Sequence, residues 1–112
     1  MKIISGKITC TKKKTIQSGS TITVQAVECF VDRNPQLLGQ IIIPSATTFP
    51  ILFEMSFDER PIIQKKFTGM FLIFVKIQNS REKILFLNSG FEFVVEKTQN
   101  ILDKIDLEVD VA

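Results

Sequence analysis

The chain has 112 residues, 45% hydrophobic and 23% charged, which suits one domain around one core and excludes a disordered protein. Its net charge of +2 is too small to indicate a nucleic-acid partner. It contains no histidine, so Ser-His-Asp and Cys-His catalytic sites are excluded and the commonest metal ligand is missing.

The first half of the chain alternates apolar and polar residues, the pattern of half-buried strands. It predicts four strands, at residues 2–10, 20–31, 37–43 and 51–57. Gly6 inside the first strand indicates a bulge or a close approach of two backbones. The second strand should turn Ile22, Val24 and Ala26 to one face. The fourth should turn Ile51, Phe53, Met55 and Phe57 to one face.

The second half continues the same period. Residues 58–67 read as a connection, and strands are predicted at 70–78, 83–88, 91–96 and 105–111. Residues 98–104 read as a loop before the last strand, in which Ile105, Leu107, Val109 and Val111 alternate with acidic residues. With no long helical period, the chain predicts an all-β fold. We expect a single domain over residues 1–112, an antiparallel β-sandwich of seven to eight strands of Greek-key type.

The predicted hairpin of residues 70–78 and 83–88 is apolar on both faces. Centred on residues 80–81, it would place Val75 opposite Phe86 and Phe74 opposite Leu87. An antiparallel strand normally leaves one face to water, so the second face needs a cover. That cover is either residues 58–67 or another chain. The candidate interaction surface consists of Leu72, Phe74, Leu85 and Leu87.

For four other features of the sequence we favour a structural interpretation over a functional one. Residues 58–59 could bind a cation but read as a solvated turn, and Lys12-Lys13-Lys14 could touch phosphate or an anionic membrane but reads as an exposed loop. Cys10 and Cys29 should stay reduced and pack as small hydrophobes. Five phenylalanines could line a lipid-sized cavity, but core filling is favoured: Phe49, Phe53, Phe57, Phe86 and Phe93.

Several short motifs, spread over nearly the whole chain, occur in an order that is also found in a known protein family. They are ISGKI at 4–8, SGS at 18–20, TVQA at 23–26, LGQ at 38–40, FPI at 49–51, FLI at 71–73 and ILFLN at 84–88. Together they resemble the YbaY/YscW-like lipoprotein family, the type III secretion lipoprotein chaperones or pilotins. The resemblance implies a β-sandwich with a binding or chaperone role and no enzymatic activity. In the secretion members the domain is lipid-anchored and helps deliver the secretin ring to the outer membrane.

The chain departs from the anchored members of that family. Cys10 follows Lys-Ile-Thr rather than a hydrophobic leader, so we expect no signal peptide, no lipobox and no membrane anchor. We therefore expect a cytoplasmic relative whose partner is another protein or a second copy, as a homodimer. Neither a cofactor nor a metal is expected, since glycine-rich phosphate loops and metal-ligand spacings are missing.

The sequence thus predicts a non-enzymatic protein-interaction or chaperone-like module. One alternative is a carrier of small apolar, lipid-like ligands that uses the phenylalanine-rich interior. Another is an enzyme that works with carboxylates alone, which needs two convergent acids in a cleft.

Overall fold

The computed structural model describes residues 2–12, 15–58, 69–94 and 101–112. These residues form β-strands and loops, and within them no helix is long and apolar enough to cross a membrane. The strands are β1 (Lys2–Thr9), β2 (Thr21–Cys29), β3 (Gln36–Ile43), β4 (Ile51–Phe57), β5 (Met70–Gln78), β6 (Ile84–Leu87), β7 (Phe91–Glu92), β8 (Ile101–Glu108) and β9 (Asp110–Val111).

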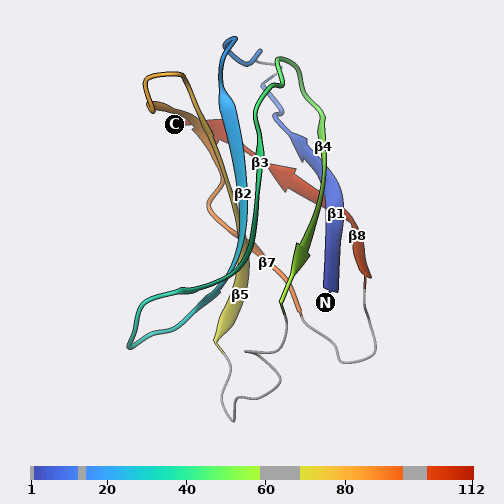
Figure 1. The fold of residues 1–112 in the computed structure, drawn as a ribbon, viewed down its shortest axis with the longest axis vertical. Helices are drawn as coiled ribbons and strands as arrows, with labels where there is room; N and C mark the ends of the chain where they lie inside the picture. The colour runs from blue at the N-terminus through green and yellow to red at the C-terminus, as the bar shows by residue number, and fades with distance from the viewer. Residues whose placement is uncertain (1, 13–14, 59–68, 95–100) are drawn as a thin grey trace.

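The strands form two sheets that pack as a β-sandwich, which confirms the predicted fold class (Figure 1). The smaller sheet has the strand order β4-β1-β8. The larger sheet has the order β3-β2-β5-β6-β9, and β7 also pairs with β5. Strand β1 is antiparallel to β4 but parallel to β8, so the smaller sheet is mixed rather than antiparallel as predicted.

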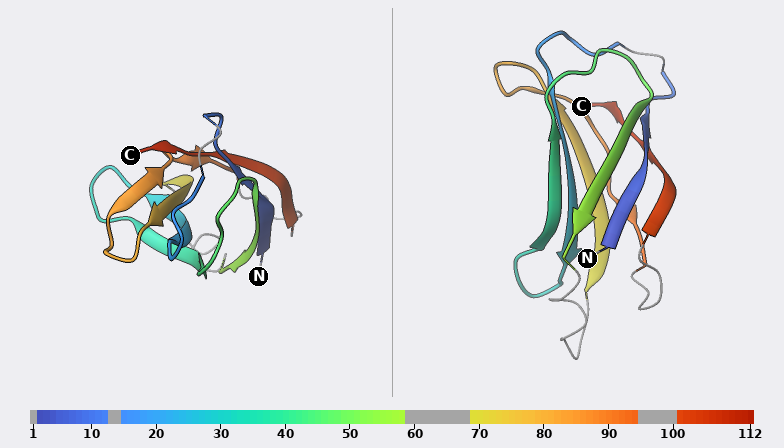
Figure 2. Two further views of the ribbon diagram at one scale, coloured as in Figure 1. Left: turned by 90° about the horizontal axis from the view of Figure 1, so that it is seen from above. Right: turned by 45° about the vertical axis from the view of Figure 1, so that its right-hand side comes forward.

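Strands β8 and β9 form one C-terminal segment that belongs to both sheets (Figure 2). Between them lies Val109, whose N–H donates to the carbonyl of Thr9 in the smaller sheet over 2.9 Å. Past Val109, β9 pairs with β6 at the edge of the larger sheet. The predicted last strand is therefore split, and Val111, which was expected in the core, is half exposed.

The core lies between the sheets, and the inward faces predicted for β2 and β4 are confirmed, although Thr23 and Val27 on the other face of β2 are buried as well, at 8% exposure each. Every second residue of β4 is buried, and Ile22, Val24 and Ala26 of β2 have no exposed area. Aromatic rings fill the space: Phe57 meets Phe93 edge-on, with ring centroids 5.9 Å apart. Two charged residues, Lys2 and Glu28, are also buried, and the carboxylate of Glu28 accepts a 2.9 Å hydrogen bond from the N–H of Gly69.

The N-terminal half of β8 was predicted as a loop, and this is wrong. Residues 101–104 belong to a strand because Ile101 and Leu102 pair with β1, about a hundred residues earlier in the chain. A bulge at Asp103 and Lys104 disturbs the alternation, with Lys104 at a φ of 57°. Local periodicity therefore could not reveal this strand.

The irregularity predicted at Gly6 is confirmed. The register of β1 against β8 shifts between Ile4 and Gly6, and a Cβ atom at Gly6 would overlap the backbone carbonyl of Ile105. Glycine is required there because the two backbones approach more closely than a side chain allows.

Candidate interaction surface

A loop with side-chain support closes the β5–β6 hairpin. The N–H of Asn79 donates to the carbonyl of Lys83 over 2.9 Å. The side-chain Oδ1 of Asn79 accepts hydrogen bonds from the N–H groups of Arg81 and Lys83, at 2.9 and 3.0 Å. Glu82 adopts a φ of 64°. The connection is thus centred on Arg81 rather than between residues 80 and 81 as predicted.

The loop and an extra residue on β6 each shift the register of the hairpin by one residue. Strand β6 pairs Phe86 with Ile77 and Leu87 with Lys76, so the predicted partners Val75 and Phe74 are wrong by two residues. Because side chains alternate with a period of two, an even shift leaves each residue on its predicted face. Phe86 is accordingly buried, and Leu87 remains outside.

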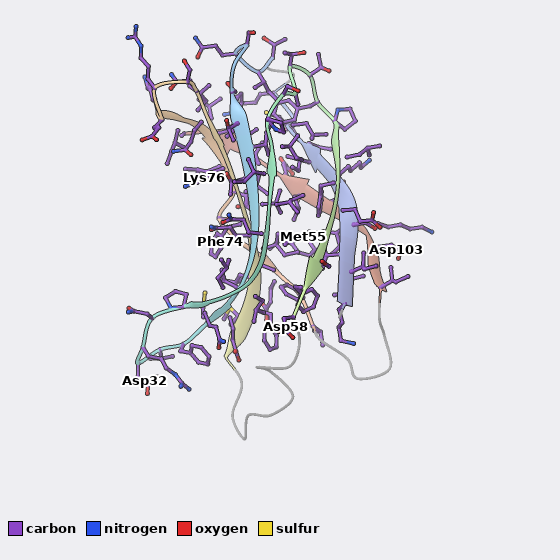
Figure 3. All side chains as sticks on the ribbon, viewed as in Figure 1. Asp32, Met55, Asp58, Phe74, Lys76 and Asp103 are labelled. Carbon is purple, nitrogen blue, oxygen red and sulfur yellow. The ribbon has the colours of Figure 1, made fainter. Side chains whose placement is uncertain are left out.

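The structure places three of the four candidate residues on the outer face of the larger sheet. Leu72 and Phe74 are partly buried on β5, and Figure 3 shows Phe74 and Lys76 on the side away from Met55 in the core. Leu87 is 42% exposed and shares with Phe74 an open hollow of about 230 Å³.

Leu85 does not join the other three. The β5–β6 register shifts between Ile77 and Gln78, which makes Leu85 an extra residue on β6. It packs against the core and lines a separate hollow with Thr15 and Val111. The bulge that moves it is not visible in the alternation of the sequence.

Asn88 takes the place of a strand residue beside β5. Its side-chain Oδ1 accepts from the N–H of Val75 over 2.8 Å, and its Nδ2 donates to the carbonyl of Ile73 over 3.0 Å. Just beyond it, Gly90 has a φ of 107°, and a Cβ atom there would lie 3.1 Å from the Phe74 ring. The loop therefore leaves room for the Phe74 ring.

Cross-strand pairing arranges the outward side chains of the larger sheet in three rows, which we call the large-sheet patch. The first row is Ile42, Thr23, Lys76 and Leu87. The middle row is Gln40, Gln25 and Phe74. The third row is Leu37, Val27, Leu72 and Glu92. Six of these eleven residues are aliphatic or aromatic, and of the six Val27 is buried. The exposed apolar area of the patch therefore comes chiefly from Leu37, Ile42 and Leu87.

The sequence did not identify Leu37 and Ile42 as part of this surface. They are 53% and 57% exposed, at the β3 edge of the patch. A bulge in β3 between its pairings with Ala26 and Val27 turns Leu38 into the core and Leu37 outward. In the apolar run of β3 no alternation could have shown which leucine faces solvent.

The lysine run at 12–14 and the acidic pair at 58–59 lie only partly within the described residues. Lys12 forms an exposed ion pair with Asp110 over 3.1 Å, while residues 13–14 lie outside the described ranges. The N–H of Asp58 donates to the carbonyl of Leu38, and residue 59 is likewise outside. The same holds for residues 59–67, the predicted internal cover.

The remaining chemistry of the described residues is sparse. Cys10 is buried, Cys29 is partly buried, and both are free thiols. Among the residues that the structure describes, no three metal-ligating side chains come together.

Comparison with known proteins bears on the fold. No family model and no curated protein matches the sequence. An alternative pilotin from the type II secretion system of Vibrio cholerae has a similar structure, with a TM-score of 0.73, 12% identity, and coverage of 99% of this chain and 98% of that one. A 9R-lipoxygenase from Cyanothece is also similar, with a TM-score of 0.57 and 13% identity, over 98% of this chain and 16% of that one.

At these identities the likeness shows the fold alone. It supports the pilotin-like architecture that the sequence motifs suggested, over nearly the full length of both chains. Membership of the YbaY/YscW-like family stays a prediction. The chain shares the β-sandwich fold of a pilotin.

Proposed function

We propose that the protein is a non-enzymatic protein-interaction module, chaperone-like in action, that binds a partner protein through the large-sheet patch. The observation that carries the proposal is that apolar side chains lie on the outer face of the larger sheet, where an antiparallel sheet normally presents polar side chains to water. Leu37, Ile42 and Leu87 are 53%, 57% and 42% exposed on it, and Phe74 lies between them. Exposed apolar patches on soluble proteins usually mark interaction surfaces.

The partner class follows from the shape of the patch. It is a sheet face several strands wide rather than a closed cavity, and its hollow beside Phe74 has a volume of about 230 Å³. Ligand sites for drug-sized molecules are concave and typically about 300–1,000 Å³. A broad apolar face suits a protein better than a small molecule. The full-length likeness to a pilotin supports the same class of partner.

The interior gives less support to the alternative of an apolar-ligand carrier. Four of the five phenylalanines that would line such a cavity contact one another in pairs: Phe49 meets Phe86 with ring centroids 5.4 Å apart, and Phe57 meets Phe93 at 5.9 Å. A lipid-like ligand would have to separate these rings and forfeit their packing.

The test compares matched substitutions on the two outer faces. Phe74→Glu and Leu87→Glu place charges in the large-sheet patch, and Leu52→Glu places one on the smaller sheet, where Leu52 is 78% exposed. The tagged wild type is used to capture its partner from the native extract, and the purified partner is then titrated calorimetrically. We expect each patch variant to weaken binding at least tenfold, about 1.4 kcal/mol, and the Leu52 variant to bind like the wild type.

Circular dichroism checks that each variant is folded before titration. If folded Phe74→Glu and Leu87→Glu proteins bind the partner as tightly as the wild type, the patch is not the binding surface and the proposal fails.

A further inference from the structure

The large-sheet patch is complementary to itself, and we propose that its occupant is a second copy of this chain, packed face to face about a two-fold axis. This inference rests on the proposed function, since it names the partner of the same patch. Two-fold dimers use the same surface on both subunits, so residue i of one copy meets residue j of the other and the reverse.

The axis that suits the patch lies in the plane of contact, crosses β5 at a right angle and passes over Phe74. It leaves the middle row facing itself and places the first row of each copy on the third row of the other. Ile42 then packs on Leu37 of the second copy. Thr23 faces Val27 of the second copy, but each is only 8% exposed and adds little contact. The two Phe74 rings meet at the centre.

The two charged residues of the patch also match. Lys76 is in the first row beside Leu87, and Glu92 is in the third row beside Leu72. The two-fold axis brings Glu92 of the second copy over Leu87. It then lies one strand spacing, about 4.8 Å, to the side of Lys76, across a sheet separation of about 10 Å that the two long side chains can span. Within the described ranges neither Lys76 nor Glu92 has a salt-bridge partner in the single chain. The dimer gives Lys76 of each copy a salt-bridge partner in Glu92 of the other, so the two-fold axis creates two such pairs.

The middle row enters the contact with one hydrogen bond between its two glutamine side chains already formed. The Nε2 of Gln25 donates to the Oε1 of Gln40 over 2.6 Å, so the two side chains already share a hydrogen bond. Polar groups that enter an interface in pairs avoid much of the cost of losing water.

The contact area is small. The patch takes in five residues of β5, Leu72 to Lys76, over about 17 Å, and four strands with their side chains over about 20 Å, so each copy contributes about 340 Å². The total of about 700 Å² lies below that of stable interfaces, which begin near about 1,200 Å². We therefore expect a weak dimer that forms at high concentration and dissociates on dilution.

Charge reversal tests the pairing directly, with the oligomeric state measured by sedimentation equilibrium over a dilution series. The wild type should give twice the mass of one chain at high concentration. Lys76→Glu and Glu92→Lys, each alone, should raise the dimer dissociation constant at least tenfold, because each sets two like charges face to face. Lys7→Glu, on the smaller sheet, should leave the dissociation constant unchanged.

Two restorations make the test specific to this interface. The double variant Lys76→Glu with Glu92→Lys should dimerise like the wild type. An equimolar mixture of the two single variants should form a heterodimer. In that heterodimer each substituted side chain faces one of opposite charge across the axis, and the unsubstituted Glu92 of one copy faces the unsubstituted Lys76 of the other.

A wild type that stays monomeric at every concentration overturns the inference, as does a dimer that both single reversals leave intact. The outcome is separable from that of the proposed function. A monomeric wild type whose captured partner is still lost with Phe74→Glu removes the second copy and leaves the partner-binding function standing. If the wild type dimerises with the predicted charge pairing but Phe74→Glu does not affect binding of the captured partner, the second copy stands and the partner-binding function of the patch fails.

Discussion

The two sheets present different outer faces to solvent. On the smaller sheet Lys7 lies between Leu52 and Asp106, and Ser5 lies opposite Glu54, so charged and polar groups interrupt the apolar ones. On the larger sheet apolar side chains continue from Leu37 on β3 to Leu72 on β5. A β-sandwich needs one apolar face on each sheet, the face that packs against the other sheet. In the smaller sheet this inner face is the apolar one. The second apolar face of the larger sheet is therefore surplus to folding.

The difference can be traced to single strands. Every second residue of β4 is buried and every intervening one is exposed. Strand β5 buries Ile73, Val75 and Ile77 in the same way, but it has Leu72 and Phe74 at the intervening positions. Because Leu72 and Phe74 are only partly buried, replacing them should cost the monomer less stability than replacing the fully buried inner residues.

The largest effect is expected in the smaller sheet, at Gly6. Gly6→Ala would set a methyl group against the carbonyl of Ile105 and force β1 and β8 apart. We expect the free energy of unfolding to fall by about 3 kcal/mol, the upper part of the range for overpacked sites. Urea denaturation measures this change.

Ser5→Ala is the matched control, because Ser5 is partly exposed on the same strand; it should change stability by less than about 0.5 kcal/mol. A Gly6→Ala protein as stable as the control would show that the two strands can separate freely, contrary to the close approach described here.

A smaller effect is expected in the larger sheet, at Asn88. Asn88→Ala would leave the N–H of Val75 and the carbonyl of Ile73 without their side-chain partner. We expect a loss of about 2 kcal/mol in the free energy of unfolding, as for other unsatisfied buried groups. Ser89→Ala, in the exposed neighbouring position, serves as the control.

Amide hydrogen exchange sharpens that result. Exchange at Val75 should accelerate in Asn88→Ala more than exchange at Ile77, which pairs with Phe86. Equal acceleration at both positions would mean that Asn88 acts on the whole sheet rather than on the gap that it fills.

The smallest effect is expected where the two sheets join, at Asp110. The hydrogen bond from the N–H of Val111, and then Lys12, hold the pKa of the Asp110 carboxyl below its ordinary value of 3.8. A carboxyl whose pKa is lowered in the folded state stabilises the protein at pH values above its ordinary pKa. This contribution is lost as the pH falls through the lowered pKa. Because the carboxylate is exposed, the effect on stability should be slight.

Carbon-detected NMR titration measures this pKa directly. Lys12→Ala should move it only part of the way back, because the hydrogen bond from Val111 remains. A wild-type midpoint at or above 3.8 would contradict the assigned contacts.

Much of this fold could be predicted from local alternation. Strand β4 alternates strictly, and its buried residues were predicted correctly. The parallel pairing of Ile101 with Ile3 could not be predicted, because it joins distant parts of the chain and the bulge at Lys104 breaks the period beside it. Sequence periodicity identifies the faces of regular strands and gives no information about their neighbours.

The candidate surface shows the same division. Leu72, Phe74 and Leu87 were placed on one face correctly, although the register of their hairpin was wrong by two residues. Leu85 was misplaced because it is the extra residue of a bulge. Leu37 was missed because the bulge in β3 decides its direction. Bulges depend on tertiary packing, and a single sequence carries little sign of them.

The parallel pairing of β1 with β8 also has a consequence for the newly made chain. One side of β1 has its partner β4 early, but the other side has none until residues 101–108 have been synthesised. At about 5–20 residues per second, roughly 5–20 s pass on the ribosome before that edge is closed. We expect nascent chains stalled before residue 101 to aggregate or recruit chaperones, and chains stalled well past the last strand to resist protease. The smaller sheet is thus completed only when β8 has been made.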